Sequence, residues 1–226
     1  MTSRIRGAVF FSGGASSWLY VSENDPNYGK SYEIVGAFSD KPGAGGIAYA
    51  KKLGVPIEVL DFQAWRRKNG VAYLDLEGRE AYFDEVLNLV TPWKLDFIML
   101  SGFMLIITEP MLSRFNNRKL NVHPADLGIT DDEGVPLYTG LNVVERAMNA
   151  GDPTRSTVHI LDPRVEGVDL GPIVAISDAL PYQPGDDPKA HQDLMKTACD
   201  GPAFQAAFEN LTRSGWPHVP WPPRFF

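Results

Sequence analysis

The sequence predicts an α/β fold of the Rossmann-like type, in which a mostly parallel, twisted sheet is flanked by helices. Apolar runs of strand length alternate with amphipathic segments of helix length through the first half of the chain. Turns rich in Gly and Pro separate these segments. The composition, 44% hydrophobic and 22% charged over 226 residues, is typical of a globular protein with one sizeable core. We therefore expect a single domain over residues 1–214, followed by an extended Pro- and aromatic-rich tail at 215–226.

The first half of the chain supplies the parallel part of the expected sheet. Short apolar runs bounded by turn-forming residues predict strands at Ile5–Phe11, Glu33–Ser39, Val55–Leu60 and Leu95–Leu100. Helical periodicity predicts helices that begin near Trp18 and that cover Ile47–Leu53 and Arg79–Val90. In such a sheet, ligands bind outside the carboxyl ends of the strands.

The second half contains further strands and a long helical pattern. A short strand should carry Asn121 and His123, and a polar loop should follow from Leu127 to Gly140. The remaining elements expected are a helix at Leu141–Ala150, paired strands at Ser156–Leu161 and Pro172–Ile176, and a long helix at Asp187–Arg213. We expect His159 to be a packed strand residue rather than a second catalytic group.

Charge and composition exclude several classes of function. A net charge of −7 argues against a nucleic-acid partner, because such proteins neutralise phosphates with clustered Lys and Arg. No apolar run approaches the ~20 residues of a membrane span. The N-terminus shows no cleavable export signal, so we expect a cytoplasmic protein. Cys199 is the lone cysteine, which rules out an internal disulfide and makes a thiolate metal site improbable.

Two stretches carry candidate chemistry. On a strand, Asn121 and His123 would point to one face, where an amide donor and an imidazole can hold an oxyanion and move a proton. Asp169, which precedes a Gly-Pro break, can lie beside them on a loop. Judged by spacing alone, an Asn-x-His motif is more often a turn or a hydrogen-bonded structural pair than a catalytic site. The loop Ser12–Ser17, between a strand and a helix start, fits either a tight turn or an anion cradle.

Taken in order, these motifs resemble the folate-dependent formyltransferases, and among them the phosphoribosylglycinamide formyltransferases. The resemblance runs from about Ala8 to Ser214. It rests on Ser12-Gly13, Phe38-Ser-Asp-Lys41, Arg79-Glu-Ala-Tyr82 with Glu85, Ser101-Gly-Phe-Met104, Asn121-Val-His-Pro124, Tyr138-Thr-Gly140, Ser156-Thr-Val-His159 and Asp169 before Gly171-Pro172.

The resemblance implies transfer of a formyl group from 10-formyltetrahydrofolate, as co-substrate and without a metal, to the primary amine of glycinamide ribonucleotide in purine biosynthesis. Its catalytic residues would be Asn121, His123 and Asp169. Its substrate-binding residues would be Ser12, Gly13, Gly14, Ala15, Ser16, Ser17, Arg79, Glu85, Pro124, Gly140 and Lys196. Its folate-binding residues would be Met104, Leu105, Ile107, Leu161 and Asp162.

Departures from the family pattern leave the acceptor open. The first loop reads Gly-Gly-Ala-Ser-Ser from Gly13, the run from Asp126 to Val135 looks like an insertion, and the segment Asp162–Asp169 is long for the family. Two alternatives to formyl transfer onto glycinamide ribonucleotide therefore remain. One is N-formyl transfer to another small amine, such as an amino sugar nucleotide, and the other is hydrolysis of 10-formyltetrahydrofolate.

Overall fold

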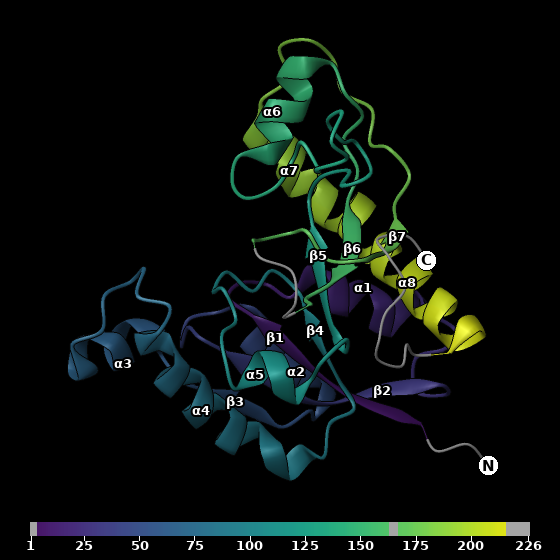
Figure 1. Cartoon of the computed structure of the whole chain (residues 1–226). Coiled ribbons are helices and arrows are strands. Elements are labelled where there is room, and N and C mark those ends of the chain that lie inside the picture. The colour runs from purple at the N-terminus through teal and green to yellow at the C-terminus, as the bar shows by residue number, and fades with distance from the viewer. Residues whose placement is uncertain (1–3, 163–166, 216–226) are drawn as a thin grey trace. The chain divides into compact units, whose positions relative to one another are not determined.

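The computed structural model describes residues 4–162 and 167–215, which form two compact units (Figure 1). Among the described residues, the first unit comprises 4–15 and 28–119, and the second comprises 16–27, 120–162 and 167–215. The single-domain assignment of residues 1–214 stays a prediction. The tail at 216–226 lies outside the described residues.

The first unit holds the parallel strands. These are β1 (Ile5–Phe11), β2 (Tyr32–Ser39), β3 (Ile57–Val59) and β4 (Phe97–Leu100). β1 pairs in parallel with both β2 and β4, and β2 pairs in parallel with β3. β1, β2 and β4 are largely buried, as their mainly apolar sequences require, whereas β3 is only partly buried. Phe10 contacts Phe38 and Phe103, with ring centroids 4.9 and 5.7 Å away. All four predicted strands of this half are confirmed.

Five short helices complete the first unit. They are α2 (Gly46–Leu53), α3 (Phe62–Asn69), α4 (Gly78–Val90), the 3-10 helix η1 (Thr91–Trp93) and α5 (Met111–Arg114). The sequence analysis missed α3 and α5. The signal for α3 was available, because the Asp61 carboxylate accepts hydrogen bonds from the backbone N–H groups of Gln63 and Ala64, and Gly70 ends the helix with φ 69°.

The second unit carries the antiparallel part of the sheet. Its strands are β5 (Lys119–His123, of which Lys119 belongs to the first unit), β6 (Thr157–Ile160) and β7 (Ile173–Ile176). β6 pairs antiparallel with both β5 and β7. In the strand order of the seven-stranded sheet, β3-β2-β1-β4 belong to the first unit and β5-β6-β7 to the second. The sheet is mostly parallel and flanked by helices, as predicted.

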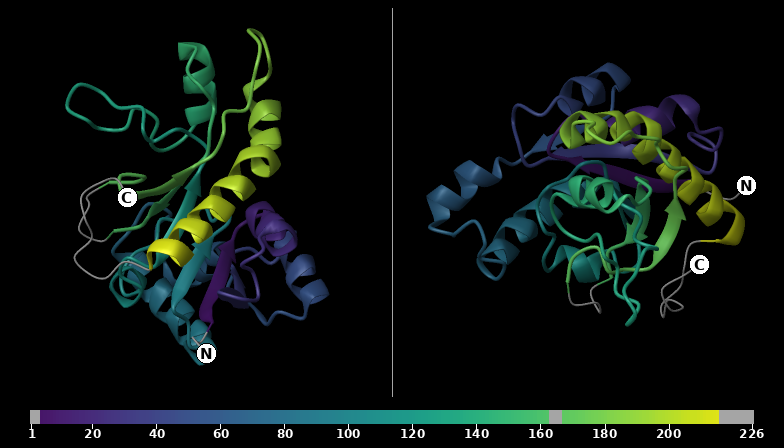
Figure 2. Two further views of the ribbon diagram at one scale, coloured as in Figure 1. Left: turned by 90° about the vertical axis from the view of Figure 1, so that its right-hand side faces the viewer. Right: turned by 90° about the horizontal axis from the view of Figure 1, so that it is seen from above.

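The helices of the second unit are α1 (Ser16–Asn24), α6 (Val143–Ala150), α7 (Pro188–Met195), the π-helix η2 (Lys196–Asp200) and α8 (Gly201–Ser214). The one long helix predicted over Asp187–Arg213 is therefore divided, because a π-helical turn separates α7 from α8. In Figures 1 and 2, α1 lies along α8. Gly201 permits this approach, since a Cβ there would lie 2.3 Å from Cγ of Tyr20. Across the described residues, no helix combines the length and apolarity needed to cross a membrane.

Replacement of Trp18 tests the packing of α1 in the second unit. Trp18 is fully buried, whereas its neighbour Leu19 is partly exposed. We expect Trp18→Ala to lower the free energy of unfolding by about 3–5 kcal/mol, because it removes a buried ring and leaves a cavity. Leu19→Ala, the matched control, should cost about 1 kcal/mol or less. Chemical denaturation measures both, and equal losses would contradict this packing.

Candidate active site

Three polar side chains of the second unit gather around the carboxylate of a fourth residue. The Oδ2 atom of Asp169 lies 3.4 Å from Nδ1 of His123, and its Oδ1 atom lies 3.4 Å from Nε2 of His159. The Asn121 amide nitrogen is 3.1 Å from the same Nε2 of His159. The structure thus brings together the three predicted catalytic residues, and it adds His159, which we had expected to be only a packing residue.

Strand register and loop conformation assemble this cluster. In the β5–β6 pair, Asn121 stands directly opposite His159, so their side chains lie on the same face of the sheet. Asp169 adopts a left-handed backbone conformation with φ 58°, which Asp tolerates better than most residues. Gly171 then passes so close to β6 that a Cβ would lie 1.7 Å from the carbonyl oxygen of Ile160. Only glycine allows the loop to return the Asp169 carboxylate to the two histidines.

The segment around Tyr138 holds His123 from the other side. Nε2 of His123 lies 2.7 Å from the carbonyl oxygen of Tyr138, and the backbone N–H of Gly140 donates to Oδ2 of Asp169 at 3.0 Å. The Tyr138 hydroxyl donates to the Asp152 carboxylate. Arg146 donates to the carbonyl oxygens of Leu137 and Thr139. These bonds fix both backbone groups that face the cluster.

His123 is buried, and its protonation state follows from two opposing effects. Burial lowers the pKa of His123 below its usual value, and the nearby Asp169 carboxylate offsets part of that change. The neutral ring therefore dominates at pH 7. A neutral ring carries one N–H, yet both of its nitrogens face an acceptor. Gaining a second proton would satisfy both contacts, so His123 is well placed to take up a proton.

Asp169 is ionised near neutral pH. Burial alone would raise its pKa, but the hydrogen bond from His159, favourable electrostatic interactions with the His123 and His159 rings and the Gly140 N–H bring the pKa below its usual value. A carboxylate that accepts from several donors is stabilised in its charged form. Asp169 can thus stabilise an imidazolium at His123.

The tautomer of His159 determines which way the Asn121 amide turns. Nδ1 of His159 is buried with no hydrogen-bond partner among the described residues. A buried donor without an acceptor is costly, so the ring proton belongs on Nε2, where it can be donated to Asp169. An Nε2–H group cannot accept a hydrogen bond from the Asn121 amide nitrogen 3.1 Å away, so the amide is better satisfied when turned over, with its oxygen next to Nε2. Both amide N–H bonds of Asn121 would consequently be free to bind a substrate oxygen.

In the first unit, the loop after β1 contains Ser12–Ala15, which were predicted to bind substrate. Ser12 is buried, and it donates its backbone N–H to the carbonyl oxygen of Gly102 at 3.0 Å. Its hydroxyl accepts the N–H of Met104 at 2.9 Å and also bonds to Asp40. Gly13 and Gly14 are exposed. Ser12 is thus occupied by structural contacts, and the two glycines present the free surface of the loop.

Arg79 and Glu85 also have partners within the first unit. Arg79 is only 2% exposed, and its two terminal nitrogens donate to the carbonyl oxygens of Tyr73 and Ile106. Glu85 accepts the indole N–H of Trp65 at 2.7 Å. The predicted contact of Arg79 with a substrate stays a prediction.

The segment after β4 alternates between buried and exposed side chains. Of the three folate-binding residues predicted there, Leu105 and Ile107 are buried and Met104 is 59% exposed. Ile106, which was not among the predicted folate-binding residues, is also exposed. The alternation that distinguishes Met104 and Ile106 from their neighbours is the pattern of an extended segment with one face in the core.

The remaining predicted residues lie in the second unit. Ser16 and Ser17 begin α1, and Ser17 is buried. Lys196 stands in η2, where its ammonium group donates to Asp193 at 2.5 Å. Pro124 follows β5 directly, and Leu161 and Asp162 follow β6. All three are partly exposed.

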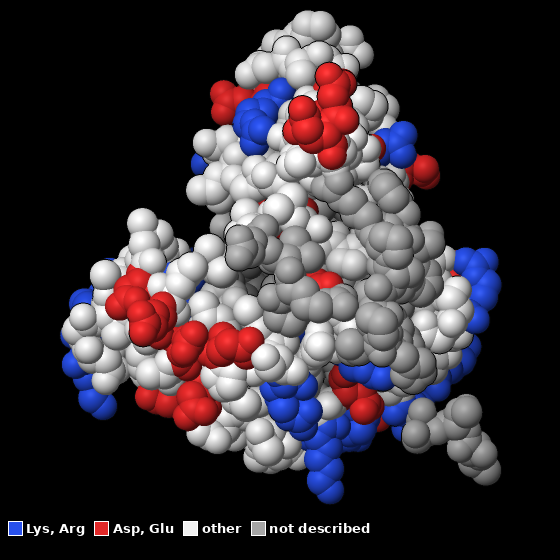
Figure 3. Space-filling view, viewed as in Figure 1, with Lys and Arg blue, Asp and Glu red and all other residues white. Residues whose placement is uncertain are grey.

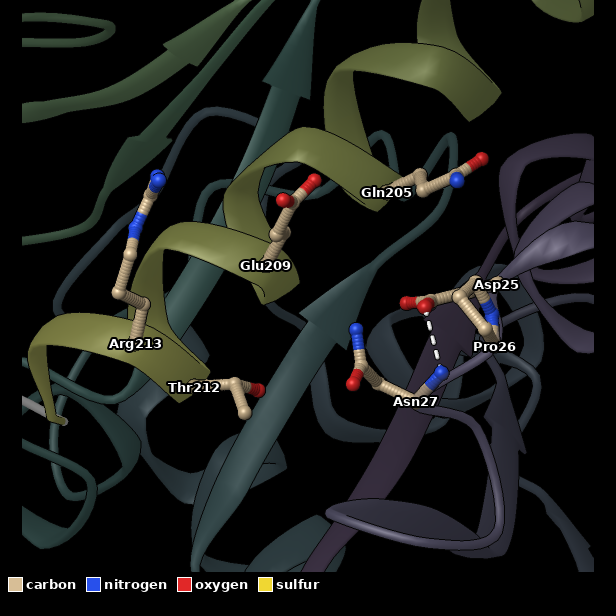
Figure 4. A pocket seen from close by; sticks show the side chains of 7 residues that line it. All are labelled: Asp25, Pro26, Asn27, Gln205, Glu209, Thr212 and Arg213. Atoms are coloured by element: carbon tan, nitrogen blue, oxygen red, sulfur yellow. Dashed lines mark hydrogen bonds between the residues drawn. The ribbon is translucent and has the colours of Figure 1, made fainter.

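A surface hollow of about 280 Å³ lies elsewhere in the second unit (Figure 4). It lies between the end of α1 and α8. Its lining residues are Asp25, Pro26, Asn27, Gln205, Glu209, Thr212 and Arg213. None of the predicted site residues lines it.

Comparison with known proteins assigns the family. The formyl transferase family profile matches residues 5–198. The chain belongs to the formyl transferase family. In this formyl transferase family member, Asn121 and His123 lie on β5, and Asp169 lies beside them on the segment that leads into β7.

Relatives and solved structures agree with this assignment. The trifunctional purine biosynthetic protein adenosine-3 of Drosophila pseudoobscura pseudoobscura is 34% identical over 187 residues, which cover 81% of this chain and 12% of that protein. The human protein of the same name is 29% identical over 216 residues, covering 94% of this chain and 19% of its own length. The chain therefore spans less than a fifth of these two relatives.

Two solved structures resemble the whole chain. Phosphoribosylglycinamide formyltransferase from Brucella melitensis is 29% identical with a TM-score of 0.71, covering 96% of this chain and 98% of that one. A formyltetrahydrofolate deformylase from Pseudomonas syringae is 15% identical with a TM-score of 0.71, covering 99% of this chain and 65% of that one. The second likeness concerns the fold alone.

Burial and the Asp169 carboxylate change the pKa of His123 in opposite directions, and their balance predicts how the ring titrates in the folded protein. The imidazole should titrate below its usual pKa of about 6.5, because burial outweighs the attraction of Asp169. Proton NMR of the histidine ring, assigned with a His123→Gln variant, measures the midpoint. A midpoint above about 6.5 would show that the carboxylate outweighs burial, and the neutral-ring account would be wrong.

Proposed function

We propose that this protein transfers a formyl group from 10-formyltetrahydrofolate to the primary amine of glycinamide ribonucleotide. The cluster of Asn121, His123, His159 and Asp169 carries the chemical part of this proposal. The names of the relatives, a purine biosynthetic protein and a phosphoribosylglycinamide formyltransferase, support the acceptor.

His123 is the proposed proton acceptor for the attacking amine, and it would return that proton to the tetrahydrofolate nitrogen that leaves as the tetrahedral intermediate collapses. It is neutral at pH 7, and on protonation both of its nitrogens would face acceptors, Tyr138 and Asp169. A base of this kind contributes most when its pKa lies near the working pH. Asp169 stabilises the charged ring and is oriented by the N–H of Gly140. Its role in the reaction is thus electrostatic.

Asn121 is the proposed donor to the formyl oxygen, which gains negative charge as the amine attacks. His159 positions it, since the ring of His159 orients the amide from the opposite strand. A fixed donor of this kind is worth roughly 10²–10³ in turnover. His159 thereby links the oxyanion donor to the carboxylate that supports His123.

The residues present suit a folate as formyl donor. When bound, 10-formyltetrahydrofolate would supply the activated formyl group. Met104 and Ile106 offer exposed apolar surface for an aromatic ring, and Leu161 and Asp162 offer backbone groups next to β6 for a pterin. For the acceptor phosphate, the exposed Gly13 and Gly14 before α1 are the groups best suited. Lys196 is a second candidate, although Asp193 now holds its ammonium group.

The acceptor is tested by offering the purified protein 10-formyltetrahydrofolate with glycinamide ribonucleotide, with a panel of amino sugar nucleotides, or with no amine. Release of tetrahydrofolate and the formylated product are both followed. We expect turnover and an N-formyl product with glycinamide ribonucleotide and at least tenfold less with each amino sugar. Turnover with an amino sugar alone would overturn the acceptor. Formate release without any formylated amine would replace transfer by hydrolysis.

A further inference from the structure

One wall of the candidate active site is a short irregular segment, residues 137–140. The carbonyl oxygen of Tyr138 lies 2.7 Å from Nε2 of His123, and the N–H of Gly140 donates to Asp169 at 3.0 Å. The segment belongs to no strand or helix, so no regular ladder of hydrogen bonds holds it. Other contacts must therefore fix the direction of its carbonyl groups.

Arg146 supplies contacts on both sides of Tyr138. Its Nη1 donates to the carbonyl oxygen of Thr139 at 3.1 Å, and its Nη2 donates to that of Leu137. The three successive carbonyl groups from 137 to 139 thus bond in turn to Arg146, His123 and Arg146. Turning the Tyr138 carbonyl away from His123 would displace its two neighbours, and one planar guanidinium holds both of them.

Helix α6 provides a packed base for Arg146. The buried face of α6 lies in one apolar cluster with Tyr138. The Tyr138 hydroxyl donates to the carboxylate of Asp152, just beyond the helix, and the guanidinium carbon of Arg146 lies 5.6 Å from the Tyr138 ring centroid. The side chain of Tyr138 is therefore held against α6, and Arg146 is the contact that fixes the backbone beside it.

The hydrogen bonds of Arg146 matter more to His123 than its charge does. Arg146 is exposed, and Figure 3 shows basic and acidic side chains together at the surface over α6, where water screens a charge. Burial has the largest effect on the pKa of His123 and lowers it. The Asp169 carboxylate and then the Tyr138 carbonyl raise this pKa, whereas the nearby His159 ring and, least of all, Arg146 lower it. Loss of the carbonyl contact should thus change the pKa more than loss of the Arg146 charge.

We propose that Arg146 is a positioning residue, whose guanidinium holds the Tyr138 carbonyl against His123 and thereby controls how well His123 accepts a proton. This inference rests on the proposed function, in which His123 takes the proton of the attacking amine. Arg146 acts through the backbone of residues 137–139. A lysine would not replace it, because an ammonium cannot span two carbonyl groups with the same geometry.

Two variants and a control separate the hydrogen bonds from the charge. Arg146→Lys keeps the charge without the fork, Arg146→Met loses both, and Arg67→Met, on the exposed side of α3, is the matched control. For Arg146→Lys, we expect the midpoint of the His123 ring titration, measured by proton NMR, to fall by about 0.5 pH unit, because the carbonyl that stabilises the charged ring moves away. For Arg146→Met the fall should be smaller, since losing the charge raises the pKa.

Kinetics and amide hydrogen exchange complete the test. In both Arg146 variants kcat should fall about tenfold, while KM for both substrates stays within about threefold. The N–H of Gly140 should exchange about tenfold faster, because its segment has lost support. The control should match the parent protein in all three measurements.

Two results would overturn the proposal. A purely electrostatic role predicts an unchanged midpoint in Arg146→Lys and a raised one in Arg146→Met. A role in folding alone predicts a lower free energy of unfolding, with the His123 titration and the exchange at Gly140 both unchanged. Titration and exchange need no turnover, so they decide the positioning role even if the proposed formyl transfer is wrong.

Discussion

The carboxylate of Asp169 is the interaction on which the site depends. It contacts His123, His159 and the Gly140 N–H at once, and no other described group links all three. This arrangement requires a left-handed residue at Asp169 and a glycine at 171, because the loop must turn sharply and pass against the backbone of β6. The backbone conformation of one loop therefore determines the electrostatics of both histidines.

A second constraint acts through backbone carbonyl and amide groups that charged or polar side chains hold in place. In the second unit, Arg146 and Asp152 fix the segment around Tyr138, whose carbonyl faces His123. In the first unit, Ser12 and Arg79 fix the segment after β4. Irregular segments gain in this way the rigidity that strands obtain from ladders, at the cost of burying polar groups. Asp40 shows that cost, since burial raises its pKa and its Oδ1 has no partner in the described chain.

The sequence allowed the fold to be predicted well, because apolar strands and amphipathic helices produce clear periodicities. It also indicated Asn121, His123 and Asp169, although only the resemblance to a family distinguished them from a structural pair. The proximity of His159 to Asn121 was not predicted, because it depends on the β5–β6 register, which no local pattern encodes. The burial of Arg79 was not predicted, because a charged residue type does not by itself reveal burial. The division of the long helix by η2 escaped detection because a π-helical turn keeps helical periodicity nearly intact.

The pH dependence of kcat/KM in an Asp169→Asn variant tests the central role of this carboxylate most directly. The carboxylate raises the pKa of His123 against the effect of burial, and protonated His123 cannot accept the amine proton. The account predicts that the acidic limb of the profile moves to lower pH in the variant, while the maximal rate falls by about 10² or more. A variant whose limb stays where the parent has it and whose rate remains near the parental value would show that Asp169 does not govern His123.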